Sequence, residues 1–71
     1  MNKDIAKRNA AEEAVKYVKN GMVVGLGTGS TAKIAVDIIG RKLSSNFQII
    51  GMPTSIETKK QAEELGIKLI D

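Results

Sequence analysis

The residues most able to do chemistry are the seven from 25 to 31, which read Gly-Leu-Gly-Thr-Gly-Ser-Thr and follow a short apolar stretch. Glycines at alternate positions allow a sharp turn and expose backbone N–H groups, and the hydroxyl side chains add donors. Helical spacing of apolar residues resumes near Ser30, so a helix would direct its unpaired N–H groups and positive dipole end at the loop. Such a loop is suited to binding a phosphate, and its candidate ligands are Thr28, Gly29, Ser30 and Thr31.

The spacing argues against two common nucleotide-binding motifs. A P-loop requires Gly-Lys-Ser/Thr, whereas Lys33 stands between Ala32 and Ile34. The dinucleotide fingerprint requires its third glycine where Ser30 stands, or at Ala32 in the register that begins at Gly27, where alanine fits only the relaxed form. No acidic residue follows at the end of the next predicted strand to bind a ribose. A nucleotide site is therefore the weaker interpretation, and the alternative to any site is a turn whose glycines serve geometry alone.

Composition excludes several function classes. A chain of 71 residues with 42% hydrophobic content is at most one small domain, and it contains no cysteine or histidine for disulfides, histidine bases or the usual zinc sites. The net charge is +3, but acids lie between the basic residues and only Tyr17 and Phe47 are aromatic, so no nucleic-acid partner is expected. No membrane span or signal peptide is recognisable, which favours a cytoplasmic location.

Helical and strand patterns alternate along the chain. Helical spacing of apolar residues predicts helices over residues 4–20, 30–43 and 54–65, and short apolar runs predict strands over residues 22–26, 47–50 and 67–70. This order predicts an α/β fold with a Rossmann-like, doubly wound parallel sheet that is incomplete.

Local signals mark the ends of these elements. Asp4 is the expected N-cap of the first helix, and Gly40 is unfavourable in the last turn of the second. Pro53 is expected to follow the second strand, because proline cannot donate to a ladder. The run Thr-Ser-Ile-Glu at 54–57 matches a capping box in which Thr54 accepts a hydrogen bond from the backbone of Glu57. Its two hydroxyls are, alternatively, candidates for contacts with a sugar.

Two motifs at compatible spacing carry a family resemblance. The first motif is the glycine-rich loop within residues 21–32, and the second is Gly-Met-Pro-Thr-Ser at residues 51–55. With these motifs and an opening helix that contains Lys7, the chain resembles the N-terminal part of type A ribose-5-phosphate isomerases. Similar loops occur in glucosamine-6-phosphate deaminases, which tend to have proline where this chain has Ala32.

The resemblance implies an aldose–ketose isomerase that interconverts ribose 5-phosphate and ribulose 5-phosphate in the pentose phosphate pathway, through an enediol and without a metal or organic cofactor. The family takes its catalytic groups from an Asp-Gly-Ala-Asp segment, a Lys-Gly-Gly-Gly segment and a particular glutamate, all further along the chain, and these 71 residues contain neither segment nor that glutamate. No catalytic residue is therefore assigned, and the isolated chain is expected to be inactive. The substrate-binding residues that carry over are Thr28, Gly29, Ser30, Thr31 and Lys7.

The resemblance also gives expectations for organisation. Residues 1–71 are expected to be the N-terminal part of a single α/β sugar-phosphate isomerase domain, a fragment without the rest of the sheet and the second domain. The full-length protein is expected to be a homo-oligomer that binds a small sugar phosphate. The alternatives are a sugar-phosphate sensor domain, a deaminase-like protein and a structural piece without a ligand; for Lys7 the alternative is an exposed helix lysine.

Overall fold

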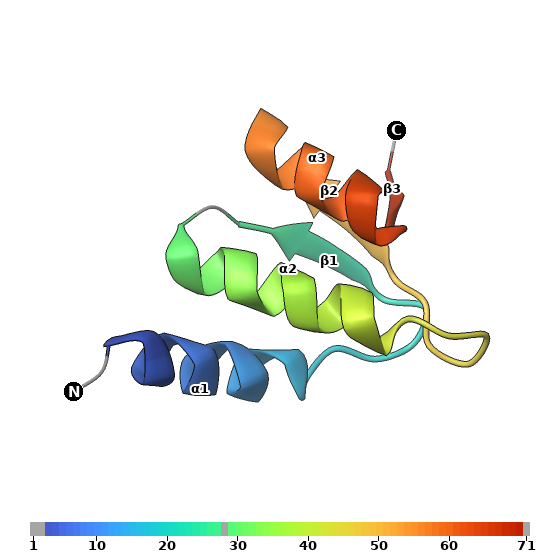
Figure 1. Cartoon of the computed structure of the whole chain (residues 1–71). Helices are drawn as coiled ribbons and strands as arrows, with labels where there is room; N and C mark the ends of the chain where they lie inside the picture. The colour runs from blue at the N-terminus through green and yellow to red at the C-terminus, as the bar shows by residue number, and fades with distance from the viewer. Residues whose placement is uncertain (1–2, 28, 71) are drawn as a thin grey trace.

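Three helices and three strands alternate along the part of the chain that the computed structural model describes, residues 3–27 and 29–70. In chain order they are α1 (Lys3–Val15), β1 (Val23–Leu26), α2 (Ser30–Lys42), β2 (Ile50–Pro53), α3 (Ile56–Leu65) and β3 (Lys68–Leu69). The strands form one parallel sheet in the order β1-β2-β3 (Figure 1). The predicted order of elements and the parallel α/β sheet are confirmed.

The helices form a layer on one face of the sheet. Because the strands lie side by side in chain order, two right-handed crossovers place α2 and α3 on the same side, and α1 packs against α2 (Figure 1). Apolar residues that recur at helical spacing in the helices meet alternate residues of the strands. The buried core between the two layers gathers Val15, Leu26, Val36, Ile39, Ile49, Ala62 and Ile67.

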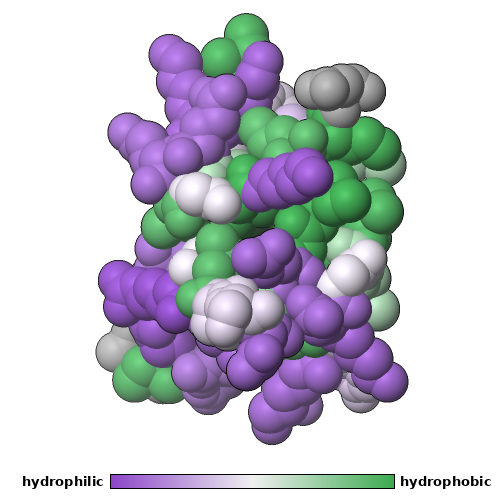
Figure 2. Space-filling view, turned by 90° about the vertical axis from the view of Figure 1, so that its right-hand side faces the viewer, coloured by the Kyte–Doolittle hydropathy of each residue, from purple (hydrophilic) through white to green (hydrophobic). Residues whose placement is uncertain are grey.

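The opposite face of the sheet carries exposed hydrophobic side chains. Val23 is 50% exposed, Met52 45% and Ile70 46%. Val23 pairs with Ile50, and the alternation of side chains along a strand puts Met52 on the same face. Hydrophobic residues gather on the right of the space-filling view, the side turned away from the viewer in Figure 1 (Figure 2). A doubly wound sheet has helices on both faces, whereas the described residues place helices on one face and leave the other without a helical layer.

The first helix is shorter than predicted. α1 begins at Lys3, so Asp4 lies in its first turn and does not cap it, and the helix ends at Val15 instead of residue 20. The chain turns away from the helical path because Asn20 and Gly21 form hydrogen bonds with Gln48, which precedes β2. Gly21 N donates to Gln48 O at 2.7 Å with a φ of 83°, and Asn20 Oδ1 accepts from Gln48 N at 2.8 Å.

The second strand lies three residues later than predicted, over Ile50–Pro53 instead of 47–50, because Phe47 is used in a tight turn with Ser44. Pro53 ends the strand from inside it. The amides of Ile50 and Thr54 donate toward β1, so the nitrogen of Pro53 faces the β3 side by alternation along the strand. It lies beyond the hydrogen bond from Ile70 N to Gly51 O, where the missing N–H of proline costs no ladder bond. The other two strands are shorter than predicted, at Val23–Leu26 and Lys68–Leu69.

Gly40 does not interrupt the second helix, which continues to Lys42. A Cβ built on Gly40 would lie 2.8 Å from the Leu65 Cβ, a separation that real Cβ atoms essentially never show. The glycine is therefore a packing residue, because it lets α2 and α3 approach each other closely.

Candidate functional site

The loop between β1 and α2 lies at the carboxyl edge of the sheet, at the end of the molecule where α1 and α2 both begin (Figure 1). Gly29 is the N-cap of α2, with φ 97° and ψ 168°, and no described atom lies within 4 Å of the position of a Cβ on this residue. This conformation is almost exclusive to glycine. The space beside it is open for another molecule to approach the backbone.

The first turn of α2 has N–H groups that no described backbone acceptor pairs, and they lie beside the same space. The first helical bond runs from Lys33 N to Gly29 O at 3.0 Å, so the N–H groups of residues 30–32 precede the helical ladder. Ser30 is exposed and Thr31 is half-buried beside it, which adds two hydroxyls to the three amides. Together with the helix dipole, these donors make a site for an anion.

The structure brings together three of the five predicted binding residues. Gly29, Ser30 and Thr31 lie consecutively at the start of α2. Lys7 lies in the first half of α1 and is half-buried. Thr28 lies outside the described residues.

The N-terminus of α3 is capped one residue later than predicted. Ser55 is the N-cap, and its Oγ accepts a hydrogen bond from Thr58 N at 3.2 Å. The prediction that Thr54 and Glu57 form the capping box was wrong, because Thr54 has a tertiary partner. Thr54 donates to Leu26 O through its Oγ1 at 2.8 Å and through its backbone N at 3.2 Å.

Thr58 extends this contact to the glycine-rich loop between β1 and α2. Ser55 Oγ donates to Thr58 Oγ1 at 3.0 Å, and Thr58 Oγ1 donates to Gly27 O at 3.2 Å. Thr58 is 3% exposed, although it is a polar residue. Sequence reasoning missed it, and the available signal was the Ser-x-x-Thr spacing of residues 55–58, the cap pattern shifted by one residue.

A second connection joins the first turn of α2 to α3. Gln61 Nε2 donates to Lys33 O at 2.8 Å, and Lys33 Nζ lies 3.5 Å from Glu57 Oε2. Both charged side chains are largely exposed, so the ion pair contributes little stability by itself. Its position gives Glu57 a partner other than the cap that the sequence predicted.

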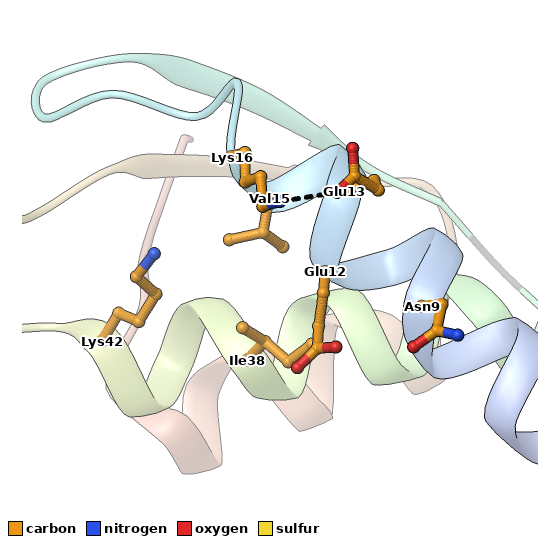
Figure 3. A pocket seen from close by; sticks show the side chains of 7 residues that line it. All are labelled: Asn9, Glu12, Glu13, Val15, Lys16, Ile38 and Lys42. Carbon is orange, nitrogen blue, oxygen red and sulfur yellow. Dashed lines mark hydrogen bonds and ion pairs between the residues drawn. The ribbon is translucent and has the colours of Figure 1, made fainter.

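A groove of about 420 Å³ runs between α1 and α2, away from the loop. Figure 3 shows polar and charged side chains around Val15 and Ile38. Lys16 Nζ donates to Glu13 Oε2 at 2.6 Å, and this bond and the Glu13 charge raise the pKa of Lys16 above its usual value. The groove is formed by the later turns of both helices and is separate from the candidate anion site.

Comparisons with known proteins agree with the fold. No family model matches the chain. A probable ribose-5-phosphate isomerase 3, chloroplastic, from Arabidopsis thaliana is 54% identical over 72 residues, which cover 99% of this chain and 26% of that protein. A ribose 5-phosphate isomerase A from Methanocaldococcus jannaschii superposes with a TM-score of 0.90 and 41% identity, over 97% of this chain and 31% of that one. The chain is a homologue of the type A ribose-5-phosphate isomerases.

The similarity to ribose-5-phosphate isomerases includes a ligand-bound relative. A D-ribose-5-phosphate isomerase solved in complex with phospho-erythronic acid has a TM-score of 0.89 and 38% identity, over the whole of this chain and 32% of that one. The chain thus spans about a third or less of the relatives that it matches. Within residues 3–27 and 29–70, none of the helices combines the length and the apolar character that a membrane crossing requires.

Proposed function

We propose that residues 1–71 form the N-terminal, phosphate-binding portion of an isomerase that interconverts D-ribose 5-phosphate and D-ribulose 5-phosphate. The observation that carries the proposal is the start of α2, where the backbone of Gly29 is open to solvent and is followed by unpaired amides and the hydroxyls of Ser30 and Thr31. Homology to ribose-5-phosphate isomerases over nearly the whole chain supports a sugar phosphate as the anion, as does the relative that binds phospho-erythronic acid.

The 5-phosphate is the part of the sugar that this site suits. Its oxygens accept hydrogen bonds from the amides of residues 30–32 and from the two hydroxyls, and the helix dipole favours its negative charge. Lys7 adds a positive charge from the neighbouring helix. Binding the phosphate at the start of α2 holds the sugar at the carboxyl edge of the sheet, where α/β enzymes carry out their chemistry. The reacting C1 and C2 atoms then lie at the far end of the ligand.

The proton transfer between C1 and C2 requires a carboxylate base, which we place outside this stretch. The described acidic residues all lie in helices: Asp4, Glu12 and Glu13 in α1, Asp37 in α2, and Glu57, Glu63 and Glu64 in α3. Asp37 pairs with Arg41 at 3.2 Å on the helix surface. The bare apolar face of the sheet supports a further layer of the same domain. A cytoplasmic location and a homo-oligomeric full-length protein stay predictions.

The isolated chain is expected to have no isomerase activity, because it binds the phosphate end of the sugar without supplying a base near the reacting carbons. Conversion of ribose 5-phosphate by the purified 71-residue chain measures this directly, with the full-length protein as the positive control. Turnover above the buffer blank that persists after repurification would contradict the assignment of the catalytic groups to the rest of the protein.

In the full-length protein, Ser30→Ala and Thr31→Ala are each expected to raise KM for ribose 5-phosphate by more than they lower kcat. Each removes a hydrogen bond to a charged group, worth about 1.5 to 3 kcal/mol, from a part of the substrate remote from the reaction. Steady-state kinetics with ribose 5-phosphate and with unphosphorylated ribose separate binding from chemistry.

Ser45→Ala is the matched control for these variants, because Ser45 is exposed in the turn between α2 and β2, at the far end of α2 from the loop. Equal losses on ribose and on the phosphate ester would show that the loop serves the fold or the chemistry instead of the phosphate. Phosphate-dependent binding by the full-length protein without any turnover would favour a sensor over an isomerase.

A further inference from the structure

We infer that Thr58 is a positioning residue for the phosphate-binding loop, an inference that rests on the proposed function. Its hydroxyl holds the Gly27 carbonyl at 3.2 Å, and it does so from α3, an element that supplies none of the proposed phosphate ligands. The interaction connects the start of α3 to the start of the loop over 31 residues of sequence.

The hydrogen bonds at Thr58 have a defined direction. Ser55 Oγ donates to Thr58 Oγ1, and the Thr58 hydroxyl is then free to donate to Gly27 O. The neighbouring carbonyl, that of Leu26, accepts from both the hydroxyl and the amide of Thr54. Two successive carbonyls at the carboxyl end of β1 are therefore fixed by the segment that leads into α3.

The loop needs such an external constraint because its glycines leave the backbone with many conformations. Holding the Gly27 carbonyl reduces the number of conformations that must be given up when a phosphate binds, which lowers the cost of ordering the site. Burial of Thr58 keeps water from competing for its hydroxyl, so the interaction persists when the site is empty.

Positioning and helix capping use different atoms of Thr58. The cap of α3 uses the Thr58 backbone N–H and Ser55 Oγ, whereas the loop contact uses the Thr58 side-chain hydroxyl. Thr58→Val removes the hydroxyl, keeps the branched shape and leaves the cap in place. Thr58→Ser keeps the hydroxyl and removes only a methyl group.

The test is the inhibition of the full-length isomerase by inorganic phosphate, measured together with KM and kcat for ribose 5-phosphate. Thr58→Val is expected to raise KM and the phosphate inhibition constant by the same factor, about three- to tenfold for one hydrogen bond, with kcat changed by less than about twofold. Thr58→Ser is expected to restore both constants. Ser55→Gly is the control for the helix cap, because it removes the cap side chain while the Thr58 hydroxyl can still donate to Gly27 O, and it is expected to change both constants by less than about twofold.

Ile39→Val is the control for a loss of stability, because Ile39 is 3% exposed in α2 and its side chain belongs to the core. The positioning role would be overturned if Ile39→Val or Ser55→Gly raised the two constants as much as Thr58→Val does, or if Thr58→Val left both constants unchanged. Thr31→Ala tests the proposed function separately. If inorganic phosphate does not compete with substrate in the unmodified protein, or Thr31→Ala leaves its inhibition unchanged, the phosphate site itself is wrong.

Discussion

Gly29→Val is expected to lower kcat/KM for ribose 5-phosphate by about 10- to 100-fold in the full-length protein, from a backbone strain of about 1 to 3 kcal/mol. Gly29 has φ 97° and ψ 168°, a combination that a β-branched residue does not adopt without strain. No described atom lies within 4 Å of the new Cβ, so the side chain would instead occupy the space through which the phosphate approaches. The loss should appear mainly in KM.

Gly66 provides a matched control for this substitution. It also has a positive φ, 81°, but its ψ of 17° places it in the left-handed helical region at the C-cap of α3. Asparagine adopts that region readily, so Gly66→Asn is expected to be tolerated, whereas Gly29→Asn is expected to lose affinity like the valine variant. An unchanged KM in Gly29→Val would contradict a close approach of phosphate to this backbone.

Leu26→Ala is expected to lower the free energy of unfolding by about 2 to 5 kcal/mol, because it leaves a cavity in the core. Leu26 is 1% exposed, and its Cδ1 would lie 2.7 Å from a Cβ on Gly51 of the adjacent strand. Gly51→Ala alone is therefore expected to overpack the core, at a cost of about 1 to 3 kcal/mol. In the double variant the new methyl group enters the space that the leucine has left.

Denaturant unfolding of the two single variants and the double variant measures this compensation as a double-mutant cycle. The cost of the double variant should be smaller than the sum of the two single costs. Gly25→Ala is the control partner, because no atom of the described residues lies within 4 Å of its Cβ position, and its effect should add to that of Leu26→Ala. Additive costs for Leu26→Ala and Gly51→Ala would mean that the strands separate to accommodate the methyl group.

The type and order of the elements could be predicted because they depend on local periodicity, whereas several boundaries depend on distant partners. α1 ends early since Asn20 and Gly21 bond Gln48, which follows them by more than two dozen residues. Threonine and serine can both cap a helix, but the Thr54 hydroxyl donates to the Leu26 carbonyl, so Ser55 is the N-cap of α3. Spacing along the chain contains neither piece of information.

The same distinction applies to the candidate site. Gly29, Ser30 and Thr31 were identified because the glycine-rich loop and the helix that follows it are contiguous in sequence. The positive φ of Gly29 agrees with the sharp turn that glycines at alternate positions allow. Thr58 was missed because its partner, the Gly27 carbonyl, is a backbone atom far away in the sequence. Every residue has a backbone carbonyl, so the residue types do not indicate which one accepts the hydrogen bond.

The single-sided arrangement of α1, α2 and α3 has a consequence for synthesis on the ribosome. Each helix packs beside the next one in the chain, so this layer uses contacts between successive elements and is expected to form early as the chain emerges. If residues 1–71 are the N-terminal portion that we propose, the nascent protein exposes the face with Val23, Met52 and Ile70 until the rest of the domain is made. During that interval the growing chain offers a flat apolar surface that chaperones recognise and neighbouring polysome chains can aggregate on.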